Sequence, residues 1–231
     1  MHLIIIKLLL IFLVTLLLAS CTTLYQPNSL NIPLLEKKNE GSLIVSTGTN
    51  LFEIQSAYAI TDNYAIMFNY SKADNGGELS FKQSFGEFAV GYFAPLNNIN
   101  VVETYLGAGY GKSSNLDKWD LPDNSETTFK SSSTFFRLFA QGNFGVKTDN
   151  VELGVAVRAS YLHLSELKIQ EYSSDISIDG FFIAPVLFLR IGLPPLKLNA
   201  QLGFSYSANY PNASFYQPII MSVGLAMRIG Q

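Results

Sequence analysis

The segment His163-Leu164-Ser165-Glu166 carries the residue types best suited to covalent chemistry. Side chains two positions apart on a strand share a face, so His163 could accept a proton from a nucleophilic Ser165. Glu166 or Glu171 would then orient the imidazole, and the reaction class would be hydrolysis. The plainer interpretation is a histidine at the rim of the fold beside a loop serine, and we expect no enzyme.

Metal chemistry has few candidate ligands in this chain. The sequence contains two histidines and one cysteine, and one of the histidines, His2, lies in the N-terminal apolar segment. A structural zinc site needs four Cys or His ligands. We therefore expect no metal site and no cofactor.

Charged residues recur singly at polar positions of alternating segments. Paired carboxylates could perform acid–base catalysis. A buried charge needs a partner, however, and the arginines match the acids in number, so an ion-pair network is preferred. The proposed members are Glu53, Glu87, Glu103, Glu152, Arg137, Arg158, Arg190 and Arg228.

The cysteine, Cys21, directly follows an apolar run at 8–18 that is preceded by Lys7. About eleven residues at a rise of ~1.5 Å cannot cross a ~30 Å hydrocarbon core, so the run indicates an export signal. Leu18-Ala19-Ser20-Cys21 resembles the lipobox of bacterial lipoproteins. That resemblance implies attachment of a diacylglyceryl group to the Cys21 thiol, cleavage before Cys21 and acylation of the new amine, with fatty acids such as palmitate. With Thr22 next, it also implies an outer-membrane location.

The composition is unusual for a soluble domain. Charged residues make up 14% of the chain, against roughly a quarter in soluble proteins. A lipid-facing surface would account for the shortage. The net charge is −3 and no basic block occurs, so nucleic acid is not an expected partner.

Beyond Gly41 the chain alternates between apolar and polar residues in segments of about 9–16 residues. Short turns are expected at 61–63, 95–98, 148–150 and 193–195, and longer polar loops at 73–78, 112–132, 166–179 and 210–217. Turns and loops follow one another in strict alternation. This order predicts an all-β fold, a closed antiparallel up-and-down transmembrane β-barrel.

The polar faces of these segments are poor in lysine and rich in Gly, Ser, Asn and Gln. In 196–206, for example, Leu198 and Leu202 alternate with Asn199 and Gln201. We therefore expect the polar faces inside, the apolar faces against lipid, and tyrosines such as Tyr58 at the rims. A water-soluble lipoprotein barrel is the rival arrangement.

Nine alternating segments lie between Leu51 and Ile229, and Leu43 to Thr47 offers a tenth. Ten strands would place both barrel ends on the short-turn side, from which a lipidated tether should arrive; eight strands is the alternative. The expected organisation is a signal peptide at 1–20, an extended lipidated tether at 21–40 and the barrel at 41–231.

Two stretches carry a family resemblance. They are Tyr25-x-Pro27-Asn28-x-x-Asn31-x-Pro33-Leu34 with Glu36-Lys37, and Ala57-Tyr58-Ala59-Ile60-Thr61-Asp62. Together with the lipobox, they resemble small outer-membrane β-barrel lipoproteins of Gram-negative bacteria, a largely uncharacterised family. The resemblance implies a location and a fold.

We therefore expect a monomeric, lipid-anchored outer-membrane barrel with a structural or surface-interaction role and no catalysis. Its expected partners are outer-membrane lipid and an extracellular or periplasmic molecule that the sequence does not identify. Trp119, in the loop at 112–132, is the candidate contact residue. Two alternatives remain, a narrow passive channel and a hydrolase that modifies lipid A. An outer-membrane lipid A deacylase resembles this chain at His163 and Ser165.

Overall fold

The computed structural model describes residues 24–49, 51–75, 80–120, 126–169, 172–173, 177–210 and 216–230. All the strands in these ranges belong to one antiparallel sheet. Its first strands are β1 (Gly41–Gly48), β2 (Leu51–Ala59), β3 (Tyr64–Asn75), β4 (Ser80–Pro95), β5 (Asn100–Asp120) and β6 (Glu126–Lys147). The others are β7 (Val151–Ile169), β8 (Tyr172–Ser173), β9 (Ile178–Leu193), β10 (Leu196–Phe204), β11 (Tyr206–Ser207) and β12 (Ile219–Ile229). Among these residues there is no helix with the length and hydropathy to span a membrane.

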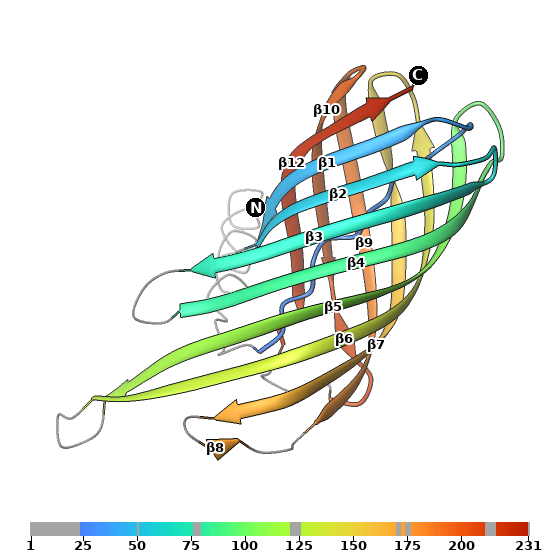
Figure 1. The fold of residues 1–231 in the computed structure, drawn as a ribbon. Coiled ribbons are helices and arrows are strands. Elements are labelled where there is room, and N and C mark those ends of the chain that lie inside the picture. Colours follow the sequence, from blue (N-terminus) through green and yellow to red (C-terminus); the bar gives the residue numbers. More distant parts are fainter. Residues whose placement is uncertain are drawn as a thin grey trace, which may run out of the picture.

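The sheet closes on itself because β1 pairs with β12 as well as with β2 (Figure 1). The closing register runs from Gly41 opposite Ile229 to Gly48 opposite Ser222. The two-residue strands β8 and β11 only extend the pairing of β7 and β9, so ten strands make the wall. The predicted closed antiparallel barrel is confirmed, and the segment around Leu43 to Thr47 supplies the tenth strand.

Alternation along each strand gives the wall two different faces. In β10 the exposed positions include Leu198 and Leu202, at 64% and 57%, while Asn199 and Gln201 between them are buried. The same division recurs around the barrel. The polar face is thus inside and the apolar face outside, as predicted.

The two ends of the barrel differ. The short turns lie at the end that also holds Gly41 and Ile229, which is the upper end in Figure 1. At the opposite end β5 and β6 continue as a paired ribbon as far as Asp120 opposite Glu126. Most of the expected loop at 112–132 is therefore strand. The sequence of this segment is rich in Ser, Thr, Asp and Lys, so no regular apolar alternation indicated the pairing.

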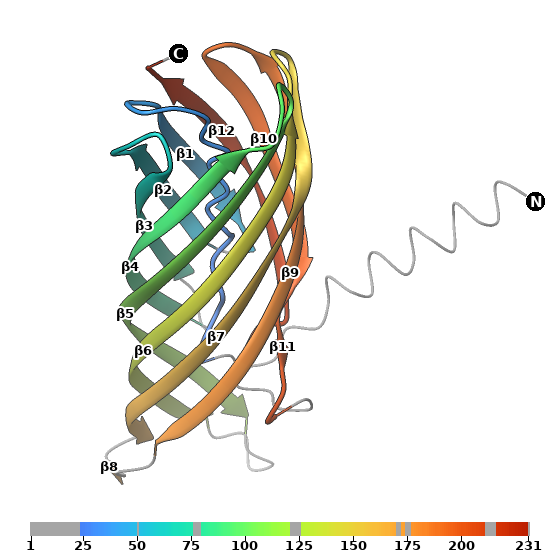
Figure 2. The same cartoon turned by 90° about the vertical axis from the view of Figure 1, so that its right-hand side faces the viewer.

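The segment 24–40 contradicts the expected position of the tether. Its described residues are extended, but they run through the lumen along the barrel (Figure 2). Tyr25 forms a bridge with Tyr216 at the long-loop end, and Asn39 donates its backbone N–H to Ala59 O at the short-turn end. The chain thus enters from the long-loop end, opposite to the expected side, and traverses the lumen before β1 begins.

The reason is physical. A narrow ring of ten strands with a polar inner face needs partners for its inward side chains, because unpaired buried polar groups are costly. A segment without secondary structure of its own has the complementary need, since its backbone groups must also be satisfied. We refer to residues Tyr25–Leu35, nearly all of which are buried, as the luminal segment.

Candidate functional site

The half of the lumen nearer the long loops is organised around Glu87 on β4, which we call the long-loop centre. Its carboxylate accepts hydrogen bonds from Arg137 Nε at 3.0 Å, Arg158 Nη1 at 3.3 Å and Asn28 Nδ2 at 2.9 Å. Arg137 also donates to the Tyr25 hydroxyl and to Asn28 Oδ1. One wall carboxylate therefore pairs with two guanidiniums, from β6 and β7, and holds the start of the luminal segment.

The half of the lumen nearer the short turns has a second centre, which we call the short-turn centre, at Glu152 on β7. It accepts from Arg190 Nη1 at 2.9 Å and Lys197 Nζ at 3.0 Å, and it pairs with Arg228 Nη2 at 2.9 Å. The same two arginines reach the luminal segment: Arg190 donates to Ile32 O at 2.6 Å and Arg228 to Leu34 O at 3.0 Å. The arginines of the wall thus contact both a wall carboxylate and backbone carbonyl groups of the luminal segment.

Two glutamines of the wall bind the segment as a neighbouring strand would. Gln83 accepts from Gln26 N at 2.9 Å and donates to Gln26 O at 2.8 Å. Gln201 does the same for Leu30, at 3.1 Å and 2.8 Å. A side-chain amide offers the same donor and acceptor as a peptide group. These two contacts therefore recognise the backbone and not the side chains of Gln26 and Leu30.

The remaining two predicted glutamates have no arginine within ion-pair distance among the described residues. Glu53 accepts from Ser29 N at 2.8 Å and from the Ser29 hydroxyl. Glu103 accepts from Leu35 N at 2.9 Å and from Asn143 Nδ2 at 2.9 Å. The structure thus divides the eight predicted members: six form ion pairs, and two bind N–H groups of the luminal segment.

Apolar contacts fix the half of the luminal segment that lies toward the short turns. Leu30, Ile32 and Leu34 pack in one cluster with wall residues that include Val186 and Phe188. Leu34 has a φ of 52°, a left-handed conformation that bulky residues rarely adopt. Gly145 provides the space, because a Cβ there would lie 2.7 Å from Leu34 Cδ1. Such local strain persists only where the surroundings over-determine it.

The long-loop mouth of the lumen is covered by aromatic rings. Tyr25 packs edge-on against Phe135, with ring centroids 5.3 Å apart, and against Phe182 at 5.9 Å. Phe182 in turn contacts Tyr216. The luminal segment is therefore held by charge, by amide hydrogen bonds and by apolar packing over its whole length, an arrangement that fills the lumen.

The predicted catalytic group lies elsewhere, on the outer surface near the long-loop rim. His163 Nδ1 is 2.6 Å from Asp179 Oδ1, and Tyr161 also donates to that carboxylate at 2.6 Å. Ser165 Oγ is 3.1 Å from Thr134 Oγ1. Within the described residues no hydrogen bond joins Ser165 to His163. Among the described residues the carboxylate that contacts the imidazole is Asp179 on β9, which was not predicted; the side chains of the expected partners Glu166 and Glu171 are outside the described part of the chain.

Four predicted residues, or their side chains, fall outside what the structure describes. Cys21 and Glu171 precede or interrupt the described ranges, and the side chains of Glu166 and Trp119 are likewise outside them. In the described residues there is also no group of three or more potential metal ligands.

Sequence reasoning missed the luminal segment as a site. One signal was present, because Leu30, Ile32 and Leu34 alternate with Asn31 and Pro33. Such alternation with two faces is typical of a chain packed between unlike surfaces.

No protein-family model and no curated protein matches the sequence. Solved structures with some likeness include the translocator domain of autotransporter NalP from Neisseria meningitidis, with 12% identity, TM-score 0.47 and coverage of 82% of this chain and 86% of that one. Others are Ail, the attachment invasion locus protein of Yersinia pestis (10%, TM-score 0.31, 83% and 99%), and the CymD monoaromatic hydrocarbon channel (6%, TM-score 0.31, 84% and 90%). At these TM-scores the likenesses carry no argument about what this chain does.

Replacing Glu87 with Ala should destabilise the barrel by about 3–5 kcal/mol, because Arg137 and Arg158 would remain buried without their carboxylate. The matched control is Asp74→Ala, which removes an acid whose pair with Lys82 is exposed and should cost at most about 1 kcal/mol. Urea unfolding, followed by the gel mobility of unheated samples, measures both. Equal losses of unfolding free energy for the two variants would contradict a stabilising role for the long-loop centre around Glu87.

Proposed function

We propose that this protein is a lipid-anchored outer-membrane β-barrel with a structural or surface-interaction role, and that it neither catalyses a reaction nor conducts solutes. The observation that carries the proposal is the luminal segment, which fills the barrel from one end to the other. A barrel whose lumen is occupied by its own chain offers its outer face, its loops and its N-terminal end for function.

The outer surface supports a membrane location. Leu106, Leu187, Leu198 and Val223 are 60–66% exposed on strands from around the barrel. A water-soluble monomer rarely exposes apolar patches of more than a few hundred Å². In lipid the same side chains are solvated by acyl chains, and the pairing of β1 with β12 closes the sheet so that its edge strands are paired.

Aromatic side chains border this apolar surface at both ends. Tyr58, Tyr64 and Tyr92 are exposed beside the short turns, and the rings of Tyr64 and Tyr92 meet edge to face with centroids 5.6 Å apart. Tyr110 and Tyr206 are exposed toward the long-loop end. Two such belts are typical of barrels that cross a bilayer.

The direction of the luminal segment supports display of the N-terminal end at the cell surface. In outer-membrane barrels the long loops face outward and the short turns face the periplasm. Tyr25 lies at the long-loop mouth, and Cys21 precedes it by four residues, a reach of at most about 14 Å. Fatty acids on Cys21 would then enter the outer leaflet, opposite to the side expected from the sequence.

A hydrolase acting on lipid A is a second candidate, favoured by the contact between His163 and Asp179. Their position at the rim would suit a lipid substrate. Ser165 bonds to Thr134 and not to His163, however, so the group lacks the nucleophile–base contact of a hydrolase. The non-catalytic role is therefore preferred.

The purified barrel should show no conductance steps in a planar bilayer, because the luminal segment occupies the path. The double variant Glu53→Ala/Gln201→Ala removes hydrogen bonds to Ser29 and Leu30 and should raise the frequency of opening. A wild-type barrel with steady open conductance would refute the sealed lumen and favour the channel.

Cys21→Ser should abolish labelling with radioactive palmitate and yet leave the barrel in the membrane pellet after alkaline washing. An epitope inserted between Thr23 and Leu24 should bind antibody on intact cells, whereas an epitope after Gln231 should bind only after permeabilisation. Release of Cys21→Ser by washing would sink the membrane-spanning proposal. Detection of the first epitope only in permeabilised cells would reverse the direction.

Ser165→Ala should leave the mass spectrum of cellular lipid A unchanged when compared with wild-type cells and with cells that lack the protein. Thr134→Ala is the matched control, since it removes the hydroxyl partner of Ser165 and spares the serine. Loss of one acyl chain from lipid A only in cells with intact Ser165 would establish the hydrolase.

A further inference from the structure

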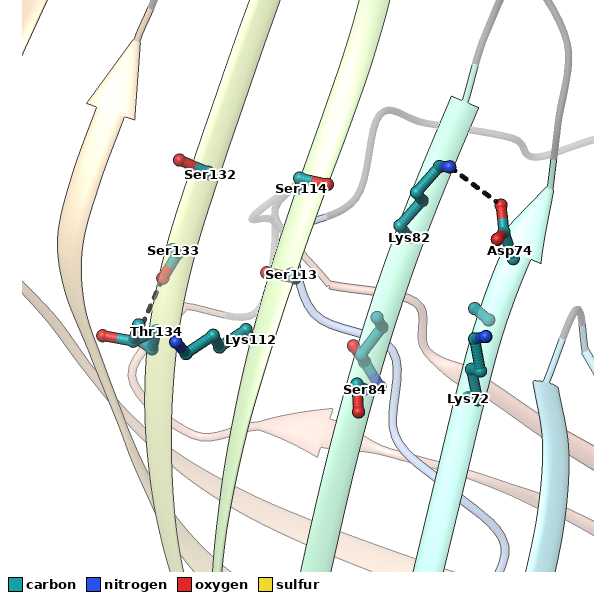
Figure 3. Close-up of a pocket in the computed structure, with 12 residues that line it drawn as sticks. Lys72, Asp74, Lys82, Ser84, Lys112, Ser113, Ser114, Ser132, Ser133 and Thr134 are labelled. Carbon is teal, nitrogen blue, oxygen red and sulfur yellow. Dashed lines mark hydrogen bonds and ion pairs between the residues drawn. The ribbon is translucent and has the colours of Figure 1, made fainter.

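A row of polar side chains crosses the outer surface just beyond the apolar belt. Lys72 on β3 lies opposite Ser84 on β4, and Ser84 lies opposite Lys112 on β5. All three are exposed (Figure 3). Neighbouring strands are about 4.8 Å apart, so the two lysines start roughly 10 Å apart with a hydroxyl between them.

The surface around this row is cationic. It belongs to a hollow of about 440 Å³ that also includes Lys82 and Asp74. Lys82 pairs with Asp74 at 3.3 Å, whereas Lys72 and Lys112 make no ion pair within the described residues. Both ammonium groups are exposed; that of Lys112 extends toward Thr134 on β6 (Figure 3), so an anion placed over Ser84 would engage it after a change of rotamer.

An apolar notch lies directly toward the belt from this row. Gly86, two residues from Ser84, sits opposite Tyr70 on one side and Tyr110 on the other. A Cβ at Gly86 would meet no atom within 4 Å, so the surface over this glycine is open, and we refer to this open position as the notch. The Tyr70 hydroxyl is 3.2 Å from Ser84 Oγ, which joins the notch to the polar row.

We propose that Lys72, Ser84 and Lys112 bind the phosphate of a membrane lipid whose acyl chain lies in the notch over Gly86. The inference rests on the membrane location proposed above. Aromatic belts mark the interface of a bilayer, and the lysines stand one outward-facing position beyond Tyr70 and Tyr110, where headgroup phosphates lie. The lipid belongs to the leaflet on the long-loop side.

The combination of features selects a lipid over a free anion. Inorganic phosphate would use the lysines and the serine hydroxyl alone. It would gain nothing from the notch over Gly86. An amphipathic ligand uses both parts, with its charge over Ser84 and its chain over Gly86. The two parts can be tested separately.

The full-length barrel in detergent is equilibrated with mixed micelles of phosphatidylcholine and lipid A, and the lipid that stays bound is counted by mass spectrometry. Wild-type protein should retain lipid A in preference to phosphatidylcholine. Lys72→Gln/Lys112→Gln should reduce that preference about tenfold. The charge-matched control is Lys37→Gln/Lys38→Gln, which alters two exposed lysines at the short-turn end and should retain it.

The notch is tested by Gly86→Leu, which should displace the acyl chain and weaken lipid A retention without harming the fold. Gly142→Leu is its control, because Gly142 also faces outward with no atom within 4 Å of an added Cβ. The gel mobility of unheated samples confirms folding of each variant. If Gly86→Leu does not fold, the lysine pair and its control still decide the proposal.

Equal retention of lipid A by wild type and by the lysine double variant would overturn the inference. So would undiminished binding of lipid A stripped of its phosphates. Competition by millimolar inorganic phosphate that depends on the lysines but not on Gly86 would identify a free-anion site instead. A barrel that stays in washed membranes while failing these tests loses only this site, whereas release by washing would remove the membrane proposal itself.

Discussion

The satisfaction of buried polar groups across a closed lumen is the constraint on which this molecule depends. The wall presents carboxylates, guanidiniums and amides to a space too narrow for bulk solvent, and the luminal segment presents backbone groups with no strand partner of its own. The wall and the luminal segment therefore supply each other's missing hydrogen-bond partners. Gln83 and Gln201 stand in for peptide groups, while Glu87 and Glu152 gather the positive charges into two centres.

The same constraint explains the division of the charged residues. An arginine that is buried alone is unstable, and each of the four shares a carboxylate with another cation. Glu53 and Glu103 can remain without an arginine because N–H groups of Ser29 and Leu35 serve as their donors. Apolar side chains such as Leu34 then fill the gaps that glycine leaves in the wall. Polar and apolar contacts therefore act together on one short stretch of chain.

Much of the architecture was readable from the sequence, since alternation with period two reports directly which side chains share a face. It gave the closed barrel, the inward orientation of Arg158 and Gln201, and the tenth strand around Val45. The position of the luminal segment was not readable, because a pattern states how a segment is built and not what surrounds it. Asp179 was missed for a related reason. Its approach to His163 depends on the register between β7 and β9, which is set by pairing and not by distance along the chain.

The passage of residues 24–40 through the barrel has a consequence for assembly. A ring of ten strands whose inward side chains are engaged by residues 24–40 leaves little room for that segment to be threaded through after the ring has formed. The sheet must therefore curl around a segment that already lies along it, and the seam between β1 and β12 is the natural last step. In this order of assembly the luminal segment is in place before the barrel closes around it.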